Sequence, residues 1–304
     1  MKLTCKRHNF RQLFIKICDW AGLYRHMSDD TYLRKMFYCC FGKDFNLKHP
    51  KTFNEKLQWL KLYDRNPEYT YLVDKYEVKS IISSRLGSQY SVPCIGLWDD
   101  FSSIDFDNMP NQFVLKTTHD SGSVIICNSK DDFDYKLSRH KLQKSLRRNY
   151  YYYRREWPYK NVKPRIIAEP LLINNGKPVD DIKIHCFNGI PKLILVCSDR
   201  YTSHGLTEDF YDIDWNHLNI MRPGVPNALF FHGKPPKLNE MIELARKISS
   251  GIPFLRVDFF IADNQIYIGE LTFFPASGFE RFVPDEWDDI LGSWLELPPF
   301  PASK

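Results

Sequence analysis

RVDFFIADNQIYIGELTFFP, residues 256–275, is the stretch that decides the fold. Two runs of β-branched and aromatic residues flank the turn-prone residues 263–265, a pattern typical of a β-hairpin. A turn centred on Asn264 places Asp258 opposite Glu270. Because side chains alternate along a strand, one face is predicted to carry Arg256, Asp258, Glu270 and Thr272, and the other Val257, Phe259, Tyr267 and Leu271.

Two carboxylates directly opposite each other destabilise a sheet unless something lies between them. A hard cation with oxygen ligands, such as magnesium, is the natural candidate. The hairpin alone leaves a second interpretation open, in which one carboxylate is exposed and the other pairs with Arg256.

Composition narrows the class of protein. The 304 residues, 43% hydrophobic and 26% charged, are enough for one large or two smaller globular domains. A net charge of +5 suits phosphate-rich or acidic ligands but falls short of a dedicated nucleic-acid binder. The eight cysteines lack paired CxxC spacing, so no zinc site is indicated and a reducing cytoplasm is expected. Neither a signal peptide nor an 18-residue apolar run is seen.

The N-terminal part reads as helical. Apolar residues at helical spacing predict amphipathic helices around residues 10–17 and 32–37. Basic residues surround both; docking on the protein's own body is expected, and contact with a membrane surface is the alternative. Thr52 and Glu55 form a capping box for a third helix, and another helix is predicted between Asp74 and Gly87.

Strands are predicted further along the chain. Residues 113–127 read as two strands joined by a polar loop, and more strands are expected at 165–173, 183–187 and 193–197. A helix is expected at 240–249, and the region 200–236 reads as loop.

The loop of residues 119–123, HDSGS, is a candidate phosphate site. Small hydroxylated residues around a glycine let backbone N–H groups approach an anion. Strand alternation places Lys116 on the same face as Val114 and Thr118, where its ammonium reaches the same anion. An ordinary hairpin loop is the competing interpretation.

Glu169 is a candidate for adenine binding. It is followed by Pro170, whose missing N–H is typical of a strand edge or a hinge. A free carbonyl with Leu171 and Leu172 beside it suits the edge of an adenine ring. The alternative is a strand end with an exposed glutamate.

Asp212 and Asp214 support a rival function. They form a D-x-D pair, a pattern with which many glycosyltransferases hold a metal and a sugar nucleotide. The sequence has no G-x-S-x-G and no HExxH, so serine-nucleophile and zinc-protease chemistry are excluded.

Several separated motifs, taken in order, resemble the TupA-like branch of the ATP-grasp enzymes. They include TFNEKLQWLKLYDRNP, LVDKYEVK, NQFVLKTTHDSGSVI, REWPYKN, RIIAEPLL, FNGIPK, RVDFF and GELTFFPASGF. The resemblance implies an α+β ATP-grasp fold, in which two α+β subdomains with antiparallel sheets grip ATP, preceded by a helical N-terminal segment. We expect an N-terminal extension (1–50), a small preceding domain (51–110), two ATP-grasp subdomains (111–175 and 176–296) and a tail (297–304).

The resemblance also assigns roles to residues. Lys75 and Lys116 become phosphate-binding lysines, and His119, Asp120, Ser121, Gly122 and Ser123 become the loop over the phosphates. Glu169 and Leu171 take the adenine. Lys183 reaches the nucleotide, and Arg256 faces the transferring phosphoryl group or the reacting carboxylate. The magnesium ligands are Asp258, Glu270 and Thr272. Many ATP-grasp ligases have asparagine where this chain has Thr272, a weaker ligand, which leaves one or two metal ions open.

The chemistry implied by the resemblance is ATP- and Mg²⁺-dependent ligation of a carboxylate to an amine through an acyl phosphate. For the TupA-like branch the expected substrates are a sugar carboxylate such as a uronic acid and an amino acid or peptide, in surface polysaccharide or capsule synthesis. Arg200, Tyr201 and the loop 203–217 are candidate substrate contacts by position. The expected location is cytoplasmic, with peripheral association with membrane polysaccharide machinery at the inner face. Nucleic acid is not an expected partner. A D-x-D glycosyltransferase and a non-catalytic nucleotide- or glycan-binding protein are the alternatives.

Overall fold

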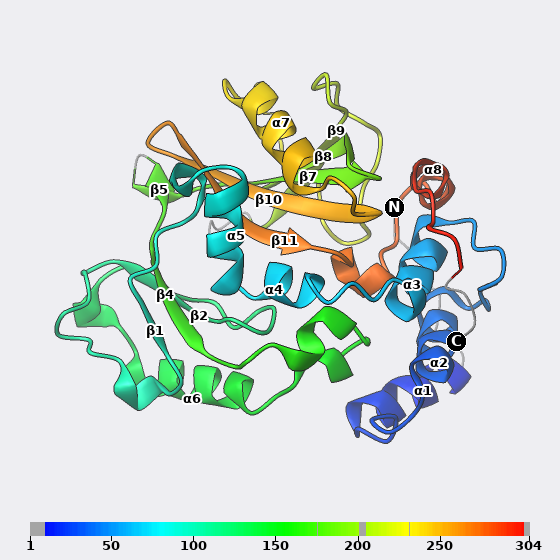
Figure 1. The fold of residues 1–304 in the computed structure, drawn as a ribbon, viewed down its shortest axis with the longest axis horizontal. Helices are drawn as coiled ribbons and strands as arrows, with labels where there is room; N and C mark the ends of the chain where they lie inside the picture. The colour runs from blue at the N-terminus through cyan, green and yellow to red at the C-terminus, as the bar shows by residue number, and fades with distance from the viewer. Residues whose placement is uncertain (1–9, 175, 201–204, 231, 301–304) are drawn as a thin grey trace.

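The structure contains a four-stranded and a five-stranded antiparallel sheet, and helices cover their outer sides and one end of the molecule (Figure 1). The computed structural model describes residues 10–174, 176–200, 205–230 and 232–300. Its α-helices are α1 (Phe10–Trp20), α2 (Asp29–Phe41), α3 (Phe53–Tyr63), α4 (Tyr69–Val73), α5 (Glu77–Arg85), α6 (Tyr135–Leu146), α7 (Leu238–Ile248) and α8 (Trp287–Trp294).

The first sheet has four strands in the order β1-β4-β2-β3. They are β1 (Gly96–Trp98), β2 (Phe113–Thr117), β3 (Ile125–Cys127) and β4 (Ile166–Pro170). Phe113, Leu115 and Ile166 point into a core that Leu142 of α6 completes. Strand β1 comes from the range expected to form a separate preceding domain, so this sheet draws on residues before 111. The other predicted domain limits stay predictions.

The second sheet has five strands in the order β11-β10-β7-β8-β9. They are β7 (Asp181–Phe187), β8 (Ile190–Ser198), β9 (Thr207–Tyr211), β10 (Phe254–Ala262) and β11 (Gln265–Thr272), and a separate two-stranded ribbon joins β5 (Ile173–Asn174) to β6 (Lys177–Pro178). Helix α7 packs on β7 and β8 through an apolar stripe that includes Met241 and Ile248. The expected strands and helix are confirmed here, and the region 200–236, expected to be rich in loops, also contains the short strand β9.

The hairpin of residues 256–275 forms as predicted, with one irregularity. Asp258 pairs with Glu270, and Arg256 with Thr272. A bulge at Gly269 then shifts the register, so that Phe259 pairs with Ile268 and Phe260 with Tyr267. The prediction that Tyr267 shares a face with Phe259 is therefore wrong, because the extra residue reverses the alternation.

The glycine at the bulge makes room for an aromatic ring. A Cβ built on Gly269 would lie 2.2 Å from Cε2 of the Phe260 ring, far inside van der Waals contact. With phenylalanine at position 260, the bulge therefore favours a residue without a side chain, and it lies next to the predicted metal ligand Glu270.

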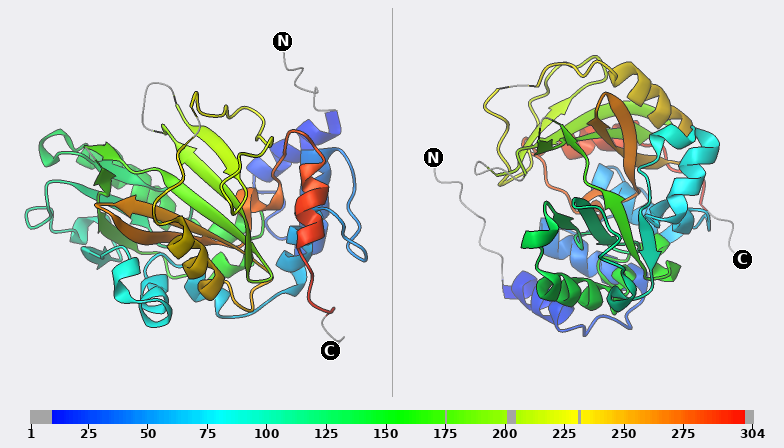
Figure 2. Two further views of the ribbon diagram at one scale, coloured as in Figure 1. Left: turned by 90° about the horizontal axis from the view of Figure 1, so that it is seen from above. Right: turned by 90° about the vertical axis from the view of Figure 1, so that its left-hand side faces the viewer.

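The helical end of the molecule holds α1, α2, α3 and α8 (Figure 2). The capping box predicted for α3 is present, since Thr52 accepts from the N–H of Glu55 and Glu55 caps in return. Phe300, in the predicted tail, packs its ring 5.2 Å from that of Trp59. The segment after 296 is therefore held against α3 as far as residue 300.

Docking on the protein's own body is confirmed for α2, and α1 docks as well, but not through the predicted face. Helix α2 buries Leu33, Met36 and Phe37 completely. Helix α1 packs on α2 through Ile15, and its Cys18 is also buried. The apolar stripe that was expected to dock stays exposed, and it consists of Phe10, Leu13, Phe14 and Ile17. Among the described residues, no helix is long and apolar enough to cross a membrane.

Candidate active site

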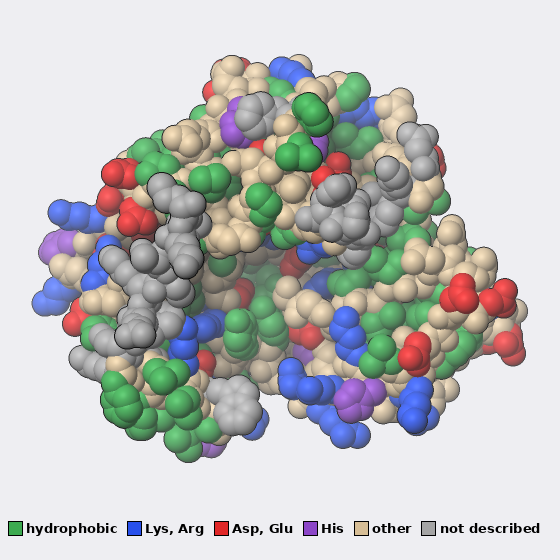
Figure 3. Space-filling model, turned by 180° about the vertical axis from the view of Figure 1, so that it is seen from behind, with side chains coloured by type: hydrophobic (Ala, Val, Ile, Leu, Met, Phe, Trp, Pro, Cys, Tyr) green, Lys and Arg blue, Asp and Glu red, His purple; other side chains and the backbone are tan. Residues whose placement is uncertain are grey.

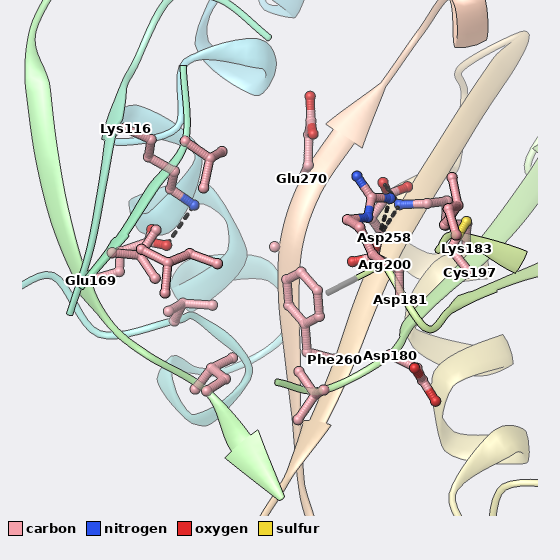
Figure 4. A pocket seen from close by; sticks show the side chains of 18 of the residues that line it. Lys116, Glu169, Asp180, Asp181, Lys183, Cys197, Arg200, Asp258, Phe260 and Glu270 are labelled. Carbon is pink, nitrogen blue, oxygen red and sulfur yellow. Dashed lines mark hydrogen bonds and ion pairs between the residues drawn. The ribbon is translucent and has the colours of Figure 1, made fainter. Parts of the chain in front are cut away.

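A cavity of about 1080 Å³ lies between the two sheets and receives side chains from both (Figure 4). The space-filling view shows the hollow between the two halves of the molecule (Figure 3). One wall comes from β2, β3 and β4, and the other from β7, β8, β10 and β11. A volume of this size is at the upper end of the range for small-molecule sites.

The first wall is organised around the buried Glu169. Lys116 of β2 places Nζ 2.5 Å from Glu169 Oε2, and Lys79 of α5 places Nζ 2.6 Å from Oε1. Burial raises the pKa of Glu169, but the two lysines outweigh it and hold that pKa below its usual value. Burial lowers the pKa of Lys79. Glu169 therefore stays ionised and fixes both ammonium groups.

Sequence reasoning missed Lys79. It lies four residues after Lys75, a spacing that places side chains on one side of a helix. Its position beside Lys116 was not detectable without the fold, because α5, β2 and the Glu169 strand β4 that joins the two lysines are far apart in the chain.

The phosphate loop divides into two kinds of residue. Ser121 and Gly122 line the cavity. Asp120 instead turns inward and accepts hydrogen bonds from Thr117 (2.5 Å), Ser123 (2.6 Å) and Ser145.

The remaining loop residues have structural contacts. Nε2 of His119 lies 3.0 Å from the carbonyl oxygen of Arg148 and is buried. Lys75 lines the cavity and donates to the backbone carbonyl of Asp120. The His119, Asp120 and Ser123 side chains thus make contacts within the protein and brace the tip formed by residues 121–122. The expected role of residues 119–123 as a loop over the phosphates stays a prediction.

An apolar section of the cavity begins at the end of β4. Pro170, Leu171 and Leu172 line it from the first wall, with Val114 and Ile126 beside them, and Phe260 lies on the second wall. Apolar side chains on both walls of a cavity suit a planar ring. Glu169 and Leu171, the residues predicted to hold adenine, both line the cavity, and their adenine role stays a prediction.

The second wall is centred on Asp258, whose carboxylate is held by two cations. Arg256 binds it with two hydrogen bonds, Nε to Oδ1 at 2.6 Å and Nη2 to Oδ2 at 2.7 Å. Lys183 of β7 lies 2.6 Å from Oδ2. Burial raises the pKa of Asp258, but Arg256 and Lys183 outweigh it and lower that pKa to about 2. Asp258 also raises the pKa of both cations against the effect of burial.

Glu270 differs from Asp258 in its contacts. It lines the cavity opposite Asp258 in the strand pair, and no hydrogen bond or ion pair is formed by its carboxylate in the described chain. In Figure 4 its side chain lies apart from the Asp258 cluster. A carboxylate on a cavity wall with no hydrogen-bond or ion-pair partner among the described residues is suited to a ligand cation.

The metal-ligand prediction can be compared with these contacts. Asp258 pairs with Glu270 across β10 and β11 as predicted, and two oxygen-donor carboxylates fit Mg²⁺, which usually takes one or two carboxylates plus phosphate oxygens. Thr272 is placed differently, because its Oγ1 accepts from Arg256 Nη2 at 3.0 Å and it does not line the cavity. Within the described ranges, no three His, Cys, Asp or Glu side chains form a metal cluster. The residues therefore fit a metal shared with a phosphate.

The far end of the cavity is lined by charged pairs. Arg200 Nη2 lies 3.0 Å from Asp181 Oδ2, and Arg222 bridges the buried Glu208 and Glu280. Sequence reasoning did not single out Arg222, which no motif marks, whereas Glu208 falls within the loop 203–217 that was predicted to contact substrate. Of the predicted substrate contacts, Tyr201, Ser203 and His204 lie outside the described residues.

The D-x-D pair does not join the cavity. Asp212 accepts hydrogen bonds from the N–H groups of Asp214 (3.0 Å) and Asn216 (2.8 Å) and so closes a turn after β9. Neither aspartate lines the cavity. The glycosyltransferase reading therefore has no support in this geometry.

Comparison with solved structures gives distant similarities. A D-alanine–D-alanine ligase from Bacillus anthracis complexed with ATP matches 66% of this chain and 55% of its own, with 18% identity and a TM-score of 0.39. The ATP-grasp ligase PsnB with a phosphomimetic precursor variant, Mg and ADP matches 79% and 63%, with 12% identity and a TM-score of 0.42. The chain thus spans little more than half the length of the first of these. Among curated proteins, none matches the chain.

The comparison with protein families identifies one family. The model of the TupA-like ATPgrasp family matches residues 55–296, which include both sheets and every residue placed around the cavity. That match covers most of the 304 residues. The chain therefore belongs to the TupA-like ATP-grasp family.

Proposed function

We propose that this protein is an ATP- and Mg²⁺-dependent carboxylate–amine ligase. One observation carries the proposal: the cleft has a lysine-rich wall facing a wall with two paired carboxylate positions. The first wall carries three positive charges, from Lys75, Lys116 and the supporting Lys79. Glu169 contributes a single negative charge. Proteins bind the phosphates of a nucleoside triphosphate with cationic side chains, and they bind its metal ion with carboxylates.

The proposed roles follow from position. Lys75 and Lys116 bind phosphates under the loop tip of Ser121 and Gly122, with the rest of the loop as its support. Leu171 and the backbone beside Glu169 hold the adenine. Asp258 and Glu270 hold magnesium, and Thr272 positions Arg256. Bound magnesium would neutralise charge on the phosphates during transfer.

Arg256 and Lys183 are proposed to act at the reacting centre. Both line the cavity while they hold Asp258. Their positive charge stabilises the negative charge that develops when a phosphoryl group moves to a substrate carboxylate. The carboxylate oxygen attacks the γ-phosphorus, ADP leaves, and an amine then displaces phosphate from the acyl phosphate to give an amide.

The substrate class belongs to the same proposal. The family assignment supports a sugar carboxylate, such as a uronic acid, and an amino acid or peptide amine, in bacterial surface polysaccharide synthesis. The charged far end of the cavity, with Arg200 and Arg222, supports polar substrates. A cytoplasmic setting at the inner face of the membrane is part of this proposal.

The test is a reaction with ATP, Mg²⁺, a panel of uronic acids and pooled amino acids, followed by ADP release and by mass spectrometry of new amides. We expect ADP and an amide to appear together and only with all components. Asp258→Asn should abolish turnover, and Asp212→Asn, an equal change at the turn after β9, should leave it intact. The reverse pattern would contradict the ligase and favour a glycosyltransferase.

A binding protein without catalysis is distinguished by the same experiment. Tight ATP binding measured by calorimetry, with no ADP release for any acceptor pair, would support that function instead.

A further inference from the structure

Helix α1 presents an apolar stripe that nothing in the described chain covers. Phe10, Leu13, Phe14 and Ile17 are 85%, 51%, 56% and 53% exposed, at the i, i+3, i+4, i+7 spacing of one helix face. Leu23, just after the helix, is 70% exposed. Four large apolar residues in a row on one helix face are more than scattered surface hydrophobics.

The net positive charge of the chain is concentrated in the same part of the sequence. Residues 1–25 contain six lysines and arginines and one acidic residue, Asp19, so they carry a net charge of +5. That equals the net charge of the whole chain, and residues 26–304 are therefore neutral overall. The apolar stripe thus lies within the one strongly basic segment of the protein.

We propose that α1 and its flanking basic residues bind the surface of an anionic phospholipid bilayer. An apolar helix face with basic flanks is the pattern of a helix that lies in the membrane interface. Lipid headgroups of negative charge attract the basic segment, while the apolar stripe enters the boundary of the acyl chains. A second copy of the chain fits less well, because two segments of charge +5 would repel each other.

The rest of the fold is compatible with this contact. Ile15 packs α1 on α2 through a different face, so the stripe is free to bind without unfolding. In Figure 3, hydrophobic side chains gather over the corner that holds α1, and the hollow of the cleft is seen from the same side. The lipid contact itself does not rest on the proposed function. The idea that an acceptor on the membrane reaches the cleft does rest on it.

The experiment is flotation of the full chain with vesicles of phosphatidylcholine alone or with about 30% phosphatidylglycerol. We expect binding to the anionic vesicles that weakens as salt rises from 0.05 to 0.5 M, because salt screens the basic segment. The double variant Leu13→Ser/Phe14→Ser should bind about tenfold more weakly or worse. Leu137→Ser is the matched control, since Leu137 is a 63% exposed leucine on α6.

Three outcomes would overturn the proposal: no binding to anionic vesicles at low salt, equal binding to both kinds of vesicle, or equal loss in the Leu137→Ser control. Circular dichroism and ATP turnover of the double variant should match the parent and show that the fold is intact. Vesicle binding without any ligase activity would contradict the proposed function alone, and ligase activity without vesicle binding would contradict this proposal alone. A dimer that the double variant dissociates, with no lipid binding, would assign the stripe to a second copy.

Discussion

The two walls of the cleft use charge in different ways. On the first wall, Lys79 and Lys116 share the single carboxylate of Glu169, and Lys75 bonds only to a backbone carbonyl among the contacts described. On the second wall, Arg256 and Lys183 both bind the carboxylate of Asp258. The first wall therefore keeps positive charge available for a ligand, whereas the second keeps Glu270 available. The strand pair β10–β11 thus carries two kinds of carboxylate: Asp258, held by Arg256 and Lys183, and Glu270, which has no such partner in the described chain.

The largest effect is expected when the ion-pair network around Asp258 is disrupted. Asp258→Asn leaves the partly buried Arg256 without its carboxylate partner and leaves Lys183 with Asp181 alone, 3.3 Å away, so we expect the free energy of unfolding to fall by about 3–5 kcal/mol. Urea denaturation followed by circular dichroism measures it. Asp99→Asn removes a surface partner of Lys163 and should change stability little, since both side chains are more than 60% exposed. An unchanged stability for Asp258→Asn would show that the network is not closed in solution.

The open wall should respond in activity rather than in stability. Lys116→Met removes a charge proposed to bind phosphate, and we expect kcat/KM for ATP to fall about 100-fold, roughly 2.7 kcal/mol. Glu169 keeps Lys79 as its partner, so the free energy of unfolding should change less than for Asp258→Asn. Steady-state ADP release gives the rate. Lys163→Met, at an exposed lysine, is the control, and an equal effect there would refute the role of Lys116.

The smallest effect is expected in the acid dependence of stability. The pKa of Asp258 is lowered in the folded protein to about 2, below its unfolded value of about 4. A lowered carboxylate pKa contributes stability that is complete above the unfolded pKa and is lost as the pH falls toward the folded one. Thermal melts between pH 5 and 2 should therefore show a shallower decline for Asp258→Asn than for the parent. Parallel curves would mean that Asp258 does not titrate as a held carboxylate.

Much of the fold was predictable because local patterns determined it. The hairpin register of Asp258 and Glu270, the capping box of Thr52 and the strand pair around the phosphate loop all follow from spacing and turn chemistry. Strand β9 was missed because its sequence, TEDFY, has little apolar alternation. Its hydrogen-bonded pairing with β8 stabilises it as a strand.

The site was less predictable where partners come from distant segments. Lys79, Arg222 and Glu208 reach the cavity or its supports only through tertiary contacts, and no local motif marks them. The inward turn of Asp120 depends on Ser145, 25 residues away. The failure at α1 is of another kind: its amphipathic pattern was read correctly, but a pattern does not say which partner covers the apolar face.

The bulge at Gly269 has a consequence for how the family can vary. Since any β-carbon there meets the Phe260 ring, position 269 can accept a side chain only if position 260 becomes smaller. The two positions should therefore change together among relatives. A relative with alanine at the first and an aliphatic residue at the second would keep the bulge, and with it the orientation of the carboxylate that follows.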